Sequence, residues 1–248
     1  MRKLIVILAL ICFQIGLAQN DTIYVFGPGG PYPAFQKVAD AFELEYDVEV
    51  KITKGPLPQW KEEAHQKSDI IFSGSEHMMT SFANLFKDEI AAESIYPLYK
   101  RKSGLLVRKG NPKNIKNLKD LTRKDIQIMV VQGAGLTGMW EDMLGNITKM
   151  QDFRNIRSKI KVFADNSGLA QKEWKENPNI DVWISWNIWQ MANEDSADFL
   201  SLPKKYTIYR NTDVALTQKG KNNSNAKAFY EFVKSDIAKQ IFKQMGWE

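Results

Sequence analysis

The hydrophobic residues of this chain recur at every second position in some segments and at every third or fourth position in the segments that follow. The first spacing is typical of strands and the second of helices, so the pattern predicts strands followed by helices. Residues 22–26, 48–52 and 69–72 have the alternating or continuous apolar pattern of strands. A turn rich in Gly, Pro or Ser follows each of them, and the segment after the first turn has apolar residues at helical spacing, including Phe35 and Phe42. Three successive strand–helix units are typical of a parallel, doubly wound sheet.

The same pattern restarts after a turn at residues 109–112, which indicates a second unit. Two helices close the chain, and the second is expected to begin at Ser235, a capping residue type, and to end before Gly246. The remaining strands and extended segments are expected at residues 104–108, 126–131, 160–164, 180–186, 206–210 and 213–217.

The predicted fold class is therefore α/β, with two doubly wound lobes joined by a hinge. Lobe I is expected to comprise residues 19–105 plus 212–248, and lobe II residues 106–211. The hinge is expected where the chain crosses between them, near residues 104–109 and 206–217. A protein of two lobes commonly holds its ligand in the cleft between them.

Composition and charge narrow the functional classes. The 248 residues are 44% hydrophobic and 25% charged, which excludes a disordered chain and a coiled coil. The net charge is +5, but no run of five like charges occurs, so nucleic-acid binding gets little support. Arg2 and Lys3, an apolar run and small residues at 16–18 predict a secretory signal peptide over residues 1–18. Its removal takes two basic and no acidic residues, so +5 becomes +3.

Residue types that carry covalent or metal chemistry are scarce. Cys12 is the only cysteine and lies inside the expected signal peptide, where Ile11 before it disfavours a lipoprotein cleavage site. Only His65 and His77 are present, and no metalloprotease, hydrolase-elbow or nucleotide-loop motif occurs. The run at 76–79, Glu-His-Met-Met, permits a soft metal site, but helix packing by the methionines is favoured. We therefore expect no catalysis, no metal and no cofactor.

Four loops that follow expected strands carry the candidate chemistry. Each opens into a helix, whose first turn offers unpaired N–H groups and the positive end of the helix dipole. Glycine lets the backbone approach an ion, so several such loops would hold an anion without a buried lysine or arginine. Tryptophans 60, 183, 186 and 189 are further candidates to line the cleft, with core packing as the competing interpretation. The candidate ligand-binding residues are Gly29, Gly30, Ser73, Gly74, Ser75, Gly135, Thr137, Gly138, Asn166, Ser167, Trp186 and Asn187.

Two motifs among these loops are specific. Residues 25–31, VFGPGGP, and 69–79, DIIFSGSEHMM, resemble the accessory colonization factor C family, which belongs to the type 2 periplasmic solute-binding proteins. Residues 107–112, 213–217 and 226–247 fit the wider superfamily. The resemblance covers nearly the whole mature chain.

The resemblance implies a periplasmic, hinge-closing binder of a small anion that serves an ABC importer or a receptor. It also implies a monomer that binds no nucleic acid. Ser73 matches a ligand-binding serine position of molybdate- and sulfate-binding relatives. The Gly29-Gly30 loop lacks the serine that molybdate binders often carry, which favours a sulfate-like ion or a small carboxylate.

Two other functions stay open from the sequence. The same fold could belong to a secreted hydrolase or transferase, although few residues look catalytic. The protein could also be a colonization or chemotaxis factor that delivers its ligand to a membrane receptor. That alternative differs in the partner and shares the binding chemistry.

Overall fold

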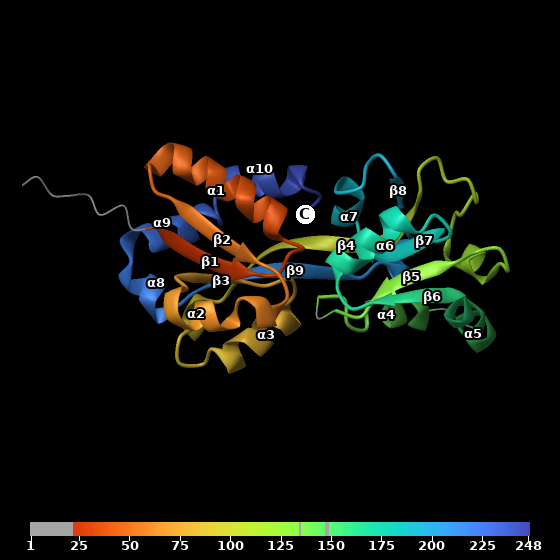
Figure 1. Ribbon diagram of the computed structural model, residues 1–248, viewed down its shortest axis with the longest axis horizontal. Helices are drawn as coiled ribbons and strands as arrows, with labels where there is room; N and C mark the ends of the chain where they lie inside the picture. The colour runs from red at the N-terminus through yellow and green to blue at the C-terminus, as the bar shows by residue number, and fades with distance from the viewer. Residues whose placement is uncertain (1–21, 134, 147–148) are drawn as a thin grey trace, which may run out of the picture.

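The computed structural model describes residues 22–133, 135–146 and 149–248. The expected signal peptide at 1–18 lies outside the described residues. Figure 1 shows two α/β lobes connected by two long strands. The fold class predicted from the sequence is therefore confirmed.

The first lobe is built on parallel strands, with β1 between β2 and β3. One face of this sheet is covered by α1, whose Phe35 stacks on Phe72 at 4.2 Å between ring centroids. The other face is covered by α2 and α3, which enclose the buried Trp60. The elements are β1 (Ile23–Gly27), α1 (Tyr32–Tyr46), β2 (Val50–Lys54), α2 (Lys61–Lys67), β3 (Ile70–Phe72) and α3 (Glu76–Leu85). Short 3₁₀ helices occur at Leu57–Gln59, Ala92–Ser94, Leu118–Thr122 and Lys204–Tyr206.

The second lobe repeats this plan, with β5 pairing in parallel with β6 and β7. Three of its helices and strands were not expected: α5, which buries only Ile156, the four-residue helix α7 and the four-residue strand β8. The elements are β5 (Ile128–Val131), α4 (Met139–Gly145), α5 (Met150–Lys159), β6 (Ile160–Ala164), α6 (Ser167–Glu176), β7 (Val182–Trp186), α7 (Ile188–Met191) and β8 (Ala197–Leu200).

Two strands cross between the lobes, β4 (Tyr96–Arg108) and β9 (Tyr209–Leu216). They pair with each other antiparallel over the first half of β4, and the second half of β4 then pairs antiparallel with β7 and β8. The strand expected at 104–108 is thus only the end of a 13-residue strand. Because β9 also runs antiparallel to β3, the sheet is mixed where the lobes meet. The residue boundaries of the lobes stay a prediction.

The chain returns to the first lobe through α8 (Gln218–Asn222), α9 (Ser224–Phe232) and α10 (Asp236–Gln244). Figure 1 shows α9 and α10 beside α1. Ser235 caps α10 by accepting the Ala238 N–H at 3.3 Å, and Gly246 follows the helix with φ of 84°. Both ends of this helix agree with the sequence prediction.

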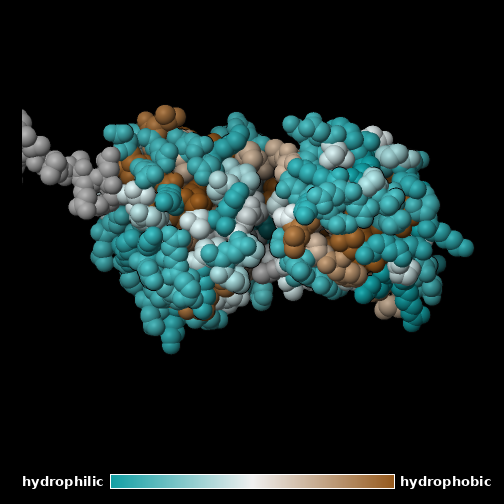
Figure 2. Space-filling view, in the orientation of Figure 1, coloured by the Kyte–Doolittle hydropathy of each residue, from teal (hydrophilic) through white to brown (hydrophobic). Residues whose placement is uncertain are grey.

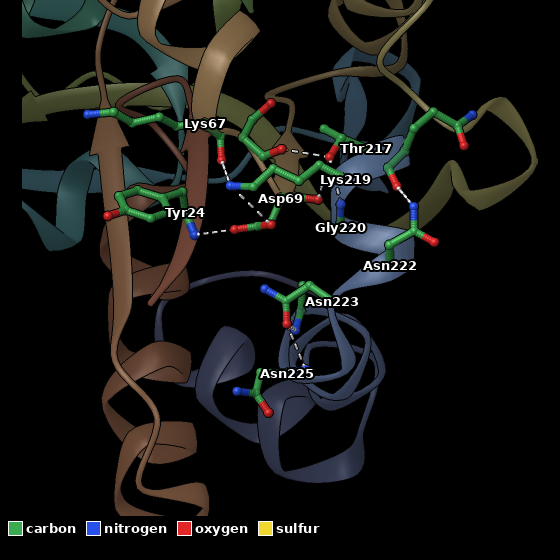
Figure 3. A network of polar contacts seen from close by, with 12 residues as sticks. Tyr24, Lys67, Asp69, Thr217, Lys219, Gly220, Asn222, Asn223 and Asn225 are labelled. Atoms are coloured by element: carbon green, nitrogen blue, oxygen red, sulfur yellow. Dashed lines mark hydrogen bonds and ion pairs between the residues drawn. The ribbon is translucent and has the colours of Figure 1, made fainter. Parts of the chain in front are cut away.

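A buried polar network fixes this return (Figure 3). Asp69 is wholly buried and accepts the Tyr24 N–H at 2.9 Å, while the Lys219 ammonium lies 3.5 Å from its other oxygen. The Thr217 hydroxyl donates to the Asp69 carbonyl at 3.2 Å. A Cβ on Gly220 would lie 2.0 Å from that carbonyl, so only glycine fits there. The start of α8 is therefore locked onto the start of β3.

On the face shown in Figure 2 both lobes are mostly hydrophilic, and the molecule is narrower between the lobes than across either one. No helix in the part of the chain that the structure describes combines the length and apolar character that a membrane crossing requires.

Candidate functional site at the lobe junction

The loops predicted to face the ligand converge where the two lobes touch. A Cβ on Gly135, in the loop after β5, would lie 3.9 Å from the Gly74 carbonyl oxygen in the loop after β3. A Cβ on Gly74 would lie 3.5 Å from Pro28, which follows β1. A Cβ on Gly133 would lie 2.8 Å from the Asp165 carbonyl, so the loop after β6 is adjacent. The structure thus brings together the loops after β1, β3, β5 and β6, which the sequence predicted to face one cleft.

A buried arginine lies at this meeting point, which the loop pattern did not predict. Arg101 is on β4 and only 2% exposed. Its Nη2 donates to the Gly74 carbonyl at 2.6 Å, whereas Nε and Nη1 have no hydrogen-bond partner among the described residues. We call the region around Gly74, Arg101, Gly135, Trp186 and Arg210 the lobe junction.

Arg210 faces Arg101 across the β4–β9 pair and connects the hinge to the second lobe. It is half-buried and donates to the Thr137 carbonyl at 2.8 Å and to the Gly135 carbonyl at 3.4 Å. Its guanidinium also lies 3.7 Å from the Asp142 carboxylate at the start of α4. The loop before α4 is thereby held against the crossing strands.

Both arginines have a lowered pKa. Burial and, to a smaller extent, the like charge of Arg210 together lower the pKa of Arg101 to about 9. Burial also lowers the pKa of Arg210, against the opposing effect of Asp142. Both side chains remain charged at neutral pH, so the lobe junction concentrates positive charge. An anion there would favour the charged form of Arg101.

Aromatic rings flank the buried guanidinium. The Arg101 guanidinium carbon lies 4.9 Å from the Trp186 ring centroid and 4.7 Å from that of Trp247. Trp60 and Trp183 instead pack inside the lobes: Trp183 lies 5.7 Å from the partly buried Trp189 and Trp60 stacks on Phe86. For these three tryptophans the structure supports core packing.

Ser73 uses its hydroxyl within the first lobe. It donates to the Asp213 carboxylate at 2.6 Å and accepts the Asp213 N–H at 3.1 Å. Asp213 is wholly buried, and burial raises its pKa from 3.8 to about 6, opposed by the Ser73 hydrogen bond and reinforced by Glu76. A ligand could take the Ser73 proton only if the bond to Asp213 broke.

Three other predicted side chains have structural partners. Ser75 caps α3 by accepting the Met78 N–H at 3.2 Å, and Asn166 caps α6 by accepting the Leu169 N–H at 2.9 Å. Asn187 accepts the Lys102 N–H at 3.3 Å and donates to the Gly246 carbonyl at 2.5 Å. Their roles toward a ligand stay predictions.

The remaining predicted residues line the loops through their backbones. A Cβ on Gly29 or Gly30 would meet nothing within 4 Å, so no neighbouring protein atom requires glycine there. Gly138 has φ of 72° and begins α4, directly after the Thr137 carbonyl that Arg210 binds. Ser167 is partly buried at the first residue of α6.

The Glu-His-Met-Met run at 76–79 is part of the fold. Met79 is in the core of the first lobe, and the Met78 sulfur accepts the Gly74 N–H at 3.3 Å, while His77 is exposed. No group of three or more His, Cys, Asp or Glu side chains that could hold a metal occurs among the residues that the structure describes.

Two α/β lobes that meet at a positively charged junction are an arrangement typical of ligand-binding proteins. The chain belongs to the bacterial extracellular solute-binding protein family, whose sequence model matches residues 23–248. No sequence among curated proteins matches it significantly. The predicted membership of the type 2 periplasmic solute-binding proteins is confirmed, whereas the narrower likeness to accessory colonization factor C stays a prediction.

Among solved structures, the chain is similar to PEB3, a protein of Campylobacter jejuni. The complex of PEB3 with L-phospholactate has 34% sequence identity and a TM-score of 0.84 over 91% of this chain and 99% of that chain. The molybdate-binding protein of Azotobacter vinelandii has 18% identity, a TM-score of 0.68 and coverage of 91% and 98%. The sulfate-binding protein SubI of Mycobacterium tuberculosis has 18% identity, a TM-score of 0.70 and coverage of 91% and 86%. The last two share the fold.

Proposed function

We propose that this protein is a non-enzymatic periplasmic solute-binding protein that captures a small anion at the lobe junction. It would deliver the anion to an ABC importer or a membrane receptor. The observation that carries the proposal is Arg101, a buried cation at the point where both lobes meet that makes a single hydrogen bond to the residues that the structure describes. The expected signal peptide supports export, and family membership supports binding.

Burial of the Arg101 charge has a free-energy cost that a bound anion would offset. Removing a guanidinium from water is unfavourable unless opposite charge and hydrogen-bond acceptors replace the water. Gly74 supplies one acceptor, and Arg210 adds a like charge. An anion would supply both the opposite charge and the missing hydrogen-bond acceptors. Each charge-assisted hydrogen bond would contribute about 1.5–3 kcal/mol.

The ligand class follows from two cations and several loop amides. Two arginines on adjacent strands suit an anion with more than one negative charge. PEB3 has been crystallised with L-phospholactate, which carries a phosphate and a carboxylate, so this three-carbon acid is the first compound to test. Sulfate-like oxyanions and small carboxylates remain the alternatives.

Binding at this place would also hold the lobes together. Arg101 and Gly74 belong to the expected first lobe, while Gly135 and Trp186 belong to the expected second lobe. An anion that contacts both sides stabilises the closed arrangement through its higher affinity for that state. A transporter or receptor could then recognise the closed surface.

A thermal-shift screen tests the proposal. The panel contains sulfate, phosphate, molybdate, malonate and L-phospholactate, with sodium chloride at matched ionic strength as the control. An anion at 100 times its Kd should raise the free energy of unfolding by about 2.7 kcal/mol. Native mass spectrometry of the purified protein gives a second measurement. The proposal is wrong if no anion of the panel raises Tm, and hydrolysis of a generic ester substrate would then favour an enzyme.

A further inference from the structure

The short segment after α10 reaches the lobe junction and covers one side of Arg101. Trp247 is 2% exposed, and its ring centroid lies 4.7 Å from the Arg101 guanidinium carbon. Trp186 covers another part of the same group at 4.9 Å. Since indole rings attract cations and Arg101 lacks a carboxylate partner among the described residues, the two rings are its main side-chain contacts.

Several contacts fix the position of Trp247. The Trp247 backbone N–H donates to the Phe242 carbonyl at 3.0 Å. The Trp247 and Phe242 rings meet edge to face, with their centroids 5.8 Å apart. Glu248 and Lys100 then exchange two backbone hydrogen bonds of 2.7 and 2.9 Å. The segment therefore pairs with β4 at the residue directly before Arg101.

The same segment also touches the second lobe. The Asn187 amide donates to the Gly246 carbonyl at 2.5 Å, while the Asn187 backbone N–H donates to the Lys102 carbonyl at 3.0 Å. A Cβ on Gly246 would lie 2.8 Å from the sulfur of Met191 and 3.2 Å from the Asn187 amide. Residues 246–248 thus contact β4 and the start of α7 together, and Figure 1 shows the C-terminus between the two lobes.

We infer that Trp247 is a positioning residue for anion binding, which holds the Arg101 guanidinium at the lobe junction. The inference rests on the proposed function, because it assigns Trp247 a role through Arg101. An arginine without this ring would sample several rotamers and would lose that freedom on binding the anion. Affinity should therefore fall more than the loss of packing explains.

The chain offers a matched control in a second arginine–tryptophan pair, in which the partly buried Arg108 lies against Trp174. Trp174 covers Arg108 at 3.7 Å inside the second lobe and is wholly buried. Trp174→Leu removes the same kind of ring from the same kind of partner, away from the lobe junction. It should lower Tm at least as much as Trp247→Leu and leave anion affinity within about twofold.

Calorimetric titration of the full chain with L-phospholactate, or with the panel anion that wild type binds most tightly, tests the inference. Trp247→Leu should raise Kd by roughly tenfold or more, and Trp247→Phe by less, because a phenyl ring still attracts the guanidinium. In an Arg101→Lys background, Trp247→Leu should change Kd by less than about threefold, because the planar group that the ring holds is gone.

The outcomes separate the inference from the proposed function. Wild type that binds no panel anion overturns the proposed function. Wild type that binds, with Trp247→Leu binding equally well, overturns only the inference. An equal loss of affinity in the wild-type and the Arg101→Lys backgrounds also overturns it, since Trp247 would then act on folding alone. If Trp247→Leu does not fold, Trp247→Met replaces it, and the inference then requires Trp247→Phe to bind more tightly than Trp247→Met.

Discussion

Strand β4 carries two arginines that each contact tryptophan, and they differ in how many hydrogen bonds their guanidinium groups donate. Arg108 lies 3.7 Å from the Trp174 ring and donates to three carbonyls, those of Ile180 at 2.7 Å, Trp174 at 2.8 Å and Asn177 at 2.6 Å. Arg101 contacts two rings but, within the described part of the chain, donates only to the Gly74 carbonyl.

The comparison teaches that burial and charge do not by themselves mark a binding site. Burial lowers the pKa of both arginines, but nearby Asp181 opposes the effect at Arg108 and Arg210 reinforces it at Arg101. Arg108 is a structural crosslink in which each of the three guanidinium nitrogens donates a hydrogen bond to a carbonyl. Arg101 keeps donors for a further partner, which is what an anion-binding side chain requires.

Replacing each arginine by methionine should affect stability in opposite ways. Arg108→Met leaves three carbonyls without their donor and should lower the free energy of unfolding by about 3 kcal/mol. Arg101→Met removes a buried charge with one partner, so the ligand-free protein should be as stable as wild type or more stable. Urea unfolding without anion measures both. An equal loss in the two variants would contradict the distinction between them.

Asp213 predicts a dependence of stability on pH. Its pKa is raised from 3.8 to about 6 by burial, so the folded protein holds this proton more strongly than the unfolded chain. The corresponding stability is fully present below about pH 4 and is lost as the pH rises through about 6; its size is on the order of 2 kcal/mol. Asp213→Asn should remove this part of the pH profile. Urea midpoints measured at several pH values test it, and superimposable profiles would contradict it.

Arg210→Gln should weaken anion binding less than a change at Arg101. Arg210 is half-buried and already donates to the Thr137 and Gly135 carbonyls. Its loss removes one of two positive charges, and we expect roughly a tenfold rise in Kd, or about 1.4 kcal/mol. Calorimetry with the tightest panel anion measures it. A larger effect than that of Arg101→Gln would make Arg210 the principal anion-binding group.

Ser73→Ala should have the smallest effect. Its hydroxyl donates to Asp213, so the variant should lose about 1 kcal/mol of stability and keep its affinity within about threefold. The same calorimetric experiment gives the affinity. A rise in Kd above tenfold in a folded variant would show that Ser73 contacts the anion directly, as its family position implies.

Much of the fold was readable because its elements have one buried face. Strand β6 has the predicted bounds, and α1 has the predicted stripe of buried phenylalanines. Helix α5 was missed because only Ile156 is buried, so no apolar period is present. The first half of β4 was missed because its lysines and Pro97 are typical of a loop, and tertiary pairing with β9 makes it a strand.

The site was only partly readable for the same reason. Gly74 and Gly135 were identified because their loops follow strands and open into helices, where ligands of open α/β sheets bind. Arg101 stands between Lys100 and Lys102, and three successive basic residues indicate a solvated surface. One signal was present: Tyr99 and Ser103 alternate with Lys100 and Lys102, and a strand with that alternation places Arg101 on the same face as Tyr99, which is the buried face in the structure. That Trp247 would cover Arg101 could not be predicted, because their contact depends on how the whole chain folds.

Calorimetric titration of wild type, Arg101→Gln and Arg108→Gln with the tightest panel anion tests the central claim most directly. The two variants remove the same charge from the same strand, and only one lies at the lobe junction. We predict that Arg101→Gln raises Kd by at least about a hundredfold, whereas Arg108→Gln stays within about twofold of wild type despite its lower stability. Equal affinities of Arg101→Gln and wild type would contradict the assignment of the lobe junction as the anion site.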